Sequence, residues 1–173
     1  MKRLRLVAWI MLAIWASWLT ALQAVTVTHT GIGAFTPDLS TLLLVACATR
    51  FHKRDVIPAA LVLALARSSF SVEPPAALFA AYLAIAILVR STRRMADLER
   101  PIFMFAVIAM VEFALASWLV LVHALRGGAS LPARLSEDLL LVLAVTLTTT
   151  ACAIFSGGFV HLPGLSPLRN RRW

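Results

Sequence analysis

Charged residues are scarce in this sequence, and acidic residues are scarcer than basic ones. Only 14% of the 173 residues are charged, against about 25% in an average soluble domain. Hydrophobic residues instead make up 61% of the chain, and its mean hydropathy is +0.88. Because this excess extends over the whole length, the composition excludes an ordinary soluble domain. It indicates a single integral membrane domain over residues 1–173.

The residue patterns that usually carry chemistry are also missing. The two cysteines, Cys47 and Cys152, lie inside apolar segments, which is typical of small packing residues rather than of a disulfide. No Cys/His cluster has the spacing of metal ligands, and the sequence has neither a phosphate-binding loop nor a serine with a convincing base partner. We therefore expect a protein that is not an enzyme and that needs no cofactor or metal.

Basic residues exceed acidic ones by 16 to 8, which gives a formal net charge of +8. In a soluble protein this excess would raise the question of nucleic-acid binding. Here the basic residues stand between apolar runs, where they orient membrane helices with respect to the bilayer. We therefore expect the lipid bilayer, and not nucleic acid, as the partner of these charges.

Six apolar segments follow one another along the chain. A spanning helix needs about 20 mostly apolar residues, because the hydrocarbon core is about 30 Å thick. The first segment has the basic flank of a signal peptide, but its length and its lack of a small-residue cleavage site favour an uncleaved span. The second segment is short for a span, at about 20 Å. The predicted spans are residues 6–25, 37–49, 56–71, 76–90, 101–125 and 139–156.

Basic residues occupy every second connection between these segments. Thirteen of the 16 lie in the N-terminus, in the 50–55 and 90–100 connections, and in the tail, whereas the others are Arg67, Arg126 and Arg134. With six crossings, all the Arg-rich stretches lie on one side of the membrane. The positive-inside rule makes that side the cytoplasm and places both termini there. The sequence thus predicts an all-α membrane protein, a compact bundle of about six transmembrane helices.

Arg67 and Glu112 are ionisable residues that stand among apolar residues of the predicted helices. Charged groups inside a membrane bundle usually face its interior and pair. Helix rise places both at similar depths, about 18 Å and 17 Å from the cytoplasmic ends of their helices. We expect them to form an ion pair near mid-membrane. Two alternatives remain open: Arg67 extends outward past Phe70 while Glu112 is protonated, or Arg67 pairs with Glu73.

The stretch Thr36-Pro37-Asp38 has the pattern of a helix start. It predicts a Thr N-cap, Pro at the first helical position and Asp near the positive end of the helix dipole. By contrast, the residues from 26 to 35 are rich in Thr and Gly and are not expected to be helical. Tyr82 is interpreted as a packing or interface residue, and the threonines at 146 and 148–150 as groups that bond to their own helix backbone.

Alanines recur every four residues in two segments. Ala76, Ala80 and Ala84 place methyl groups on one face of the fourth segment, and Ala60 and Ala64 do the same on the third. Helices in lipid associate through close backbone approach, which small side chains allow. We interpret these residues as a helix-packing face.

The order of these segments resembles that of the MreD family, the membrane proteins of the bacterial rod-shape machinery. The resemblance covers nearly the whole chain. It rests on "TPDLSTLLLVACA" at 36–48, a basic turn, an apolar segment with a Pro-bearing turn, and a further apolar segment ending "LVRSTRR". The chain departs from the family pattern in its third helix. That helix lacks glycine, and Arg67 stands near the position where the family usually carries an acidic residue.

The resemblance implies a non-enzymatic scaffold for cell shape and peptidoglycan elongation in the bacterial inner membrane. Its implied partners are an MreC-like protein, the MreB filament and the membrane proteins of cell-wall synthesis. The family fold is similar to that of the substrate-binding subunits of energy-coupling-factor transporters. The alternative function is therefore that of a substrate-binding membrane subunit for a small, vitamin-type molecule.

The predicted topology can be tested with reporter fusions. Alkaline phosphatase is active only outside the cytoplasm, so a fusion after Ser130 should be active and a fusion after Ala96 inactive. Activity at both positions would contradict the model of six crossings.

Overall fold

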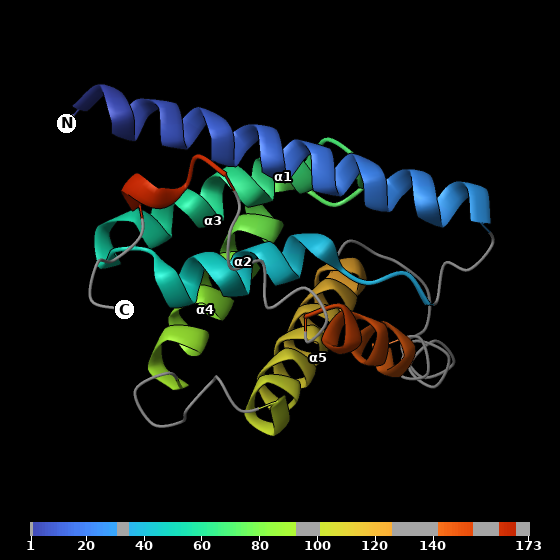
Figure 1. Cartoon of the computed structure of the whole chain (residues 1–173). Coiled ribbons are helices and arrows are strands. Elements are labelled where there is room, and N and C mark those ends of the chain that lie inside the picture. Colours follow the sequence, from blue (N-terminus) through green and yellow to red (C-terminus); the bar gives the residue numbers. More distant parts are fainter. Residues whose placement is uncertain (1, 31–34, 93–100, 126–141, 154–162, 169–173) are drawn as a thin grey trace.

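The computed structural model describes residues 2–30, 35–92, 101–125, 142–153 and 163–168, and helices make up most of these ranges (Figure 1). No strand occurs within them, which confirms the predicted all-α class. The helices are α1 (Lys2–Thr30), α2 (Leu39–Arg50), α3 (Lys53–Ser68), α4 (Pro75–Thr92), α5 (Pro101–Leu125), an unlabelled helix at Val142–Ala153, and the short 3-10 helix η2 (Ser166–Leu168).

Three of these helices are long and apolar enough to cross a membrane, and their spanning stretches are Leu4–His29, Pro75–Thr92 and Ile102–Leu119. This property indicates a membrane protein. The helix α2 has only 12 residues. It therefore rises about 18 Å, well short of the roughly 30 Å hydrocarbon core. That the shorter helices also cross the membrane, which would bring the number of spans to about six, stays a prediction.

Helix α1 extends beyond its predicted end at residue 25. The Thr26 and Thr28 hydroxyls donate hydrogen bonds to the carbonyls of Leu22 and Ala24, at 2.8 and 3.0 Å. These β-branched residues therefore continue the helix to Thr30 instead of ending it. The expectation that this stretch is not helical was wrong for residues 26–30, because back-bonded threonines are compatible with a helix.

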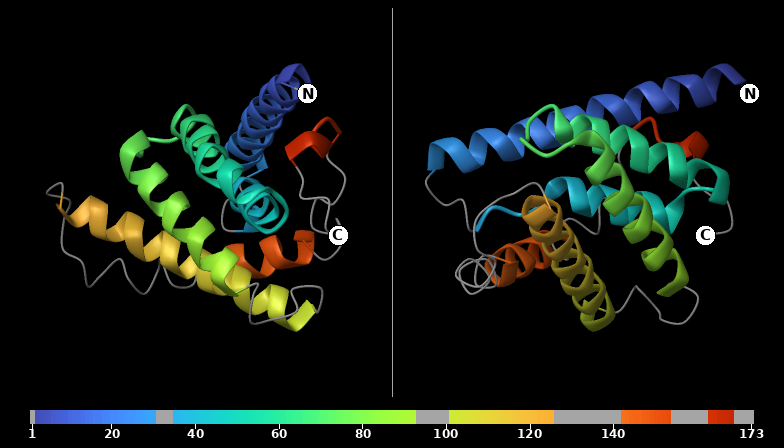
Figure 2. Two further views of the ribbon diagram at one scale, coloured as in Figure 1. Left: turned by 90° about the vertical axis from the view of Figure 1, so that its left-hand side faces the viewer. Right: turned by 180° about the vertical axis from the view of Figure 1, so that it is seen from behind.

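Helices α2 and α3 form an antiparallel pair in the middle of the molecule (Figures 1 and 2). Helix α1 packs against this pair on one side, and α4 packs against it on the other. Helix α5 runs antiparallel to α4 and packs mainly on that helix. The core between these layers is made of fully buried apolar side chains from α1 to α4, among them Leu12, Leu43, Leu63 and Leu78.

The alanine pattern has two different outcomes. Ala60 and Ala64 on α3 are completely buried, as a packing face requires. Ala76, Ala80 and Ala84 are exposed, because the buried face of α4 is formed by other residues. The prediction that these three alanines pack against other helices of this chain is therefore wrong. They form an alanine stripe that faces outward.

One end of the bundle collects several basic segments, and we call it the basic end (the left side of Figure 1). Arg5 at the start of α1 forms an ion pair with Asp55 at the start of α3, in which Arg5 Nη2 lies 2.6 and 2.7 Å from the two carboxylate oxygens. The Arg90 guanidinium at the end of α4 donates to the Phe51 carbonyl between α2 and α3, at 3.4 Å. The starts of α1 and α3 therefore lie near the end of α4.

The segment around η2 docks at the same end. The backbone N–H of His52 donates to the Leu168 carbonyl at 3.2 Å, and the Trp15 indole donates to the Pro163 carbonyl at 3.3 Å. Gly164 has a φ of 86°, and a Cβ at this position would lie 2.8 Å from Met11 Cγ. The sequence analysis also used basic residues that lie outside the described ranges, namely Arg93, Arg94, Arg100, Arg126, Arg134, Arg169, Arg171 and Arg172.

Candidate functional site

The helix α2 begins at a buried aspartate. Asp38 is the N-cap, and its carboxylate accepts a hydrogen bond from the Thr41 backbone N–H at 3.0 Å. Ser40 Oγ donates to the same carboxylate oxygen at 2.6 Å. These two bonds satisfy one oxygen of the carboxylate, and the positive end of the α2 dipole stabilises its charge further.

The capping pattern therefore differs from the one predicted. Thr36 and Pro37 precede the helix, and Asp38 takes the N-cap position that the sequence assigned to Thr36. The reason is local: the Asp38 carboxylate reaches the N–H three residues on, which is the geometry that caps a helix best. The motif was recognised correctly as a helix start, but the cap lies two residues later.

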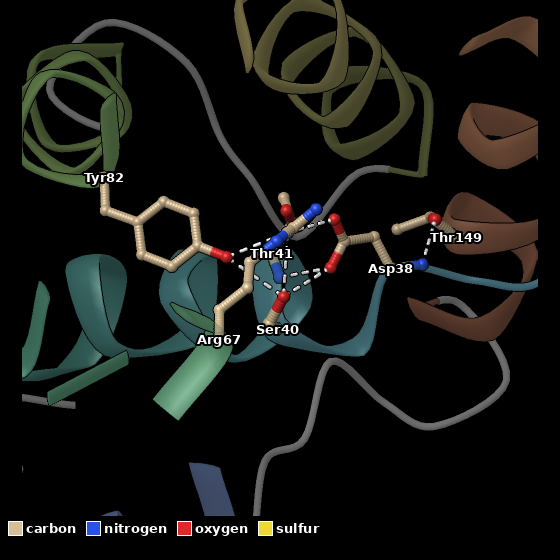
Figure 3. A network of polar contacts seen from close by, with 6 residues as sticks. All are labelled: Asp38, Ser40, Thr41, Arg67, Tyr82 and Thr149. Carbon is tan, nitrogen blue, oxygen red and sulfur yellow. Dashed lines mark hydrogen bonds and ion pairs between the residues drawn. The ribbon is translucent and has the colours of Figure 1, made fainter. Parts of the chain in front are cut away.

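Arg67, in the last turn of α3, completes the site from the neighbouring helix. Its Nη1 donates to the second Asp38 carboxylate oxygen at 2.5 Å, to Ser40 Oγ at 2.9 Å and to the Tyr82 hydroxyl at 2.9 Å. The Tyr82 hydroxyl in turn donates to Ser40 Oγ at 3.0 Å. Figure 3 shows these side chains converging from α2, α3 and α4. We call Asp38, Ser40, Arg67 and Tyr82 the clasp.

The clasp is closed on a further side by the Val142–Ala153 helix. The Thr149 hydroxyl, which is completely buried, accepts a hydrogen bond from the Asp38 backbone N–H at 2.9 Å (Figure 3). The other threonines of this helix behave as the sequence predicted, since Thr146, Thr148 and Thr150 donate to backbone carbonyls four residues earlier. Four segments of the chain thus meet at the clasp, namely α2, α3, α4 and this helix.

The predicted pair between Arg67 and Glu112 is corrected by this geometry, because the acidic partner of Arg67 is Asp38. The hairpin of α2 and α3 explains the choice. Asp38 lies almost as many residues before the turn at His52 as Arg67 lies after it, so the two stand at the same level of the antiparallel pair. The Glu73 alternative also fails, since the hydrogen bonds of Arg67 within the described residues go to Asp38, Ser40 and Tyr82.

Sequence reasoning missed the other clasp residues. Tyr82 is more than a packing residue: its ring is completely buried and lies 5.9 Å from the Arg67 guanidinium carbon, within cation–π range. Ser40 gave no signal beyond its place in the first turn after a cap. Thr149 could have been separated from its neighbours only by knowing which face of its helix is buried.

Glu112 lies close to the clasp without joining it. The residue is 6% exposed, and its Oε1 has no hydrogen-bond partner. Its carboxyl group is near enough to Asp38 and Arg67 to interact electrostatically with both. The depth argument that paired Glu112 with Arg67 therefore named the wrong acid.

The polar side chains of the clasp bind one another. The guanidinium and the carboxylate neutralise each other, and the hydroxyls of Ser40 and Tyr82 relay hydrogen bonds between them. No group of three or more His, Cys, Asp or Glu residues suited to a metal ion occurs in the described ranges.

Comparison with protein-family models, curated proteins and solved structures finds no match to this chain.

The clasp makes a prediction about stability that separates Asp38 from Glu112. Asp38→Asn keeps a capping side chain but removes the charge that compensates Arg67. We expect it to lower the free energy of unfolding by about 3 kcal/mol, near the lower limit for breaking a buried pair, because Arg67 is partly exposed. Glu112→Gln should cost less, since no ion pair is lost. Reversible unfolding of the purified protein in detergent measures both.

Asp55→Asn is the matched control, because it makes the same chemical change in the other ion pair. The Arg5 side chain of that pair is 46% exposed. We therefore expect a loss of at most about 1 kcal/mol. A larger loss for Glu112→Gln than for Asp38→Asn would show that Glu112 is the acid that compensates Arg67.

Proposed function

We propose that this chain is a non-enzymatic membrane scaffold of the bacterial cell-shape and peptidoglycan elongation machinery, similar to MreD. The observation that carries the proposal is the clasp. The segment with the MreD-like pattern, residues 36–48, contributes Asp38 and Ser40, whose polar groups hold helices together. Such a use of buried polar groups suits a protein whose task is to present a fixed bundle to its partners.

We further propose that the chain crosses the bacterial inner membrane several times, with both termini in the cytoplasm. Two observations support this topology. The basic stretches alternate along the sequence, and the basic end brings Arg5, Arg90 and the α2–α3 turn together in space. Anionic lipid headgroups attract such residues with about 1 kcal/mol each. The short helices α2 and α3 would then be embedded between the longer ones.

The outward alanine stripe of α4 is our candidate surface for a membrane partner. Ala76, Ala80 and Ala84 are exposed on a helix that is itself apolar enough to span the membrane. Small side chains on such a face let another helix approach closely. The partner proposed here is an MreC-like protein or a membrane protein of cell-wall synthesis.

A second candidate function is that of a substrate-binding subunit of a small-molecule transporter. The observation that favours it is Glu112, a buried carboxyl group beside the clasp whose Oε1 has no hydrogen-bond partner. Buried ionisable residues in membrane helices often mark functional sites.

Depletion of the protein in the bacterium that carries it distinguishes the two functions. If the protein is a scaffold for elongation, depleted cells should lose their rod shape while vitamin uptake per cell surface stays normal. Cell shape is scored by microscopy, and uptake with radiolabelled vitamins. Complementation with the unaltered chain is the control. Normal shape together with lost uptake would support the transporter subunit and exclude the scaffold.

The partner surface can be tested in the same strain. Ala80→Leu should reduce co-purification with the membrane partner, because the larger side chain holds the two helices apart. Ala106→Leu, at an exposed alanine of α5, is the matched control and should leave the partner bound. Arg93→Ala should also have little effect. If Arg93→Ala loses the partner while Ala80→Leu retains it, the docking site is the basic loop.

A further inference from the structure

Although α1 and α4 flank α3, one face of α3 is exposed and apolar. Ile57, Leu61 and Leu65 recur every four residues on this face, and about half of each residue is exposed. We call these three residues the α3 stripe. In the first turn of the same helix, Lys53 and Arg54 are exposed and take part in no hydrogen bond or ion pair within the described part of the chain. The stripe therefore begins beside a free basic pair.

The length of this face is limited by the helix itself. Helix α3 has 16 residues, so it rises about 24 Å, against roughly 30 Å for an average hydrocarbon core. Tilting the helix would only shorten the distance that it spans. The chain is not helical over residues 69–74, and Val72 in this connection is 97% exposed. Because exposed irregular backbone does not occur in the hydrocarbon region, this connection cannot lengthen the span.

Helix α1 is packed over a similar height. Arg5 is paired with Asp55, so α1 and α3 share a level at the basic end. Buried residues recur along α1 as far as Thr20, about 22 Å beyond Arg5, and none of residues 21–29 is buried. Polar residues are frequent in this unpacked stretch, namely Gln23, Thr26, Thr28 and His29. The height over which α1 is packed therefore agrees with the short length of α3.

We propose that the exposed face of α3 is a lipid-binding surface at which the bilayer is thinner than average. Its partner is an anionic phospholipid with short acyl chains. The basic pair meets the phosphate group, and the α3 stripe meets the chains. Charge complementarity thus selects the headgroup, and the length of the helix selects the chains. A bilayer thins around a short hydrophobic segment at modest cost. The inference rests on the proposed topology, in which α3 crosses the membrane.

The chain length of the lipid tests this inference. The purified full chain is reconstituted in phosphatidylglycerol vesicles whose monounsaturated chains lengthen from dimyristoleoyl through dioleoyl to dierucoyl. Thermal unfolding is followed by circular dichroism. We expect the highest midpoint in dimyristoleoyl vesicles and a fall of several degrees as the chains lengthen, because longer chains must be compressed more around α3. A maximum with longer chains, or a midpoint that does not depend on chain length, would overturn the proposal.

Two variants connect the effect to α3. Lys53→Leu combined with Arg54→Leu extends the apolar face, so dierucoyl chains should destabilise this variant less. Lys53→Arg combined with Arg54→Lys is the matched control, because it keeps both charges and should behave like the unaltered chain. Replacing phosphatidylglycerol by phosphatidylcholine with the same chains should lower the midpoint of the control more than that of the leucine variant. Equal behaviour of the two variants would contradict the proposal. If the leucine variant does not fold, glutamine at both positions gives the headgroup comparison.

Cysteine accessibility separates this inference from the topology on which it rests. In a chain with Cys47→Ala and Cys152→Ala, Ser69→Cys should react with an impermeant maleimide in spheroplasts. Arg54→Cys should react only after the spheroplasts are opened. Reaction of both cysteines from the same side would contradict the proposed topology and the lipid surface with it. Reaction from opposite sides, together with a midpoint that is independent of chain length, would leave the topology intact and overturn only the lipid surface.

Discussion

The arrangement of this bundle depends on compensating one guanidinium among apolar helices. An arginine in such surroundings is costly unless an acid and further acceptors meet it, and Arg67 finds Asp38, Ser40 and Tyr82. Each acceptor comes from a helix other than α3. The need to satisfy one side chain therefore fixes α2 and α4 against α3, while Thr149 adds the Val142–Ala153 helix through the Asp38 backbone.

Helix α3 is held by charge at both of its ends. Asp55 in its first turn binds Arg5 of α1, and Arg67 in its last turn binds Asp38 at the start of α2. Between these two ion pairs, α3 contributes small and completely buried side chains such as Ala60 and Ala64. The ion pairs set the position of α3 along its axis, and the alanines permit close contact sideways. Neither feature alone would define its register against the neighbouring helices.

Local and compositional features of this fold were predictable, whereas contacts between distant segments were not. Apolar runs located the helices, and the α5 bounds agree with the predicted 101–125, because hydropathy and helix breakers act locally. The helix start near Asp38 was recognised for the same reason. The partner of Arg67 was assigned by depth in a bilayer, which ignores the direction in which side chains point. Counting residues from the α2–α3 turn would have placed Asp38 opposite Arg67.

The position of the clasp, far from the turn that joins its two helices, restricts how this sequence can vary in length. Each residue added to or removed from a helix rotates everything beyond it by about 100°. A single insertion within α2 or α3, between the turn and the clasp, would swing one charge of the Asp38–Arg67 pair away from the other. Changes in length in relatives of this chain should therefore collect in the connections outside the hairpin, and the spacing between Asp38 and Arg67 should be inherited as a unit.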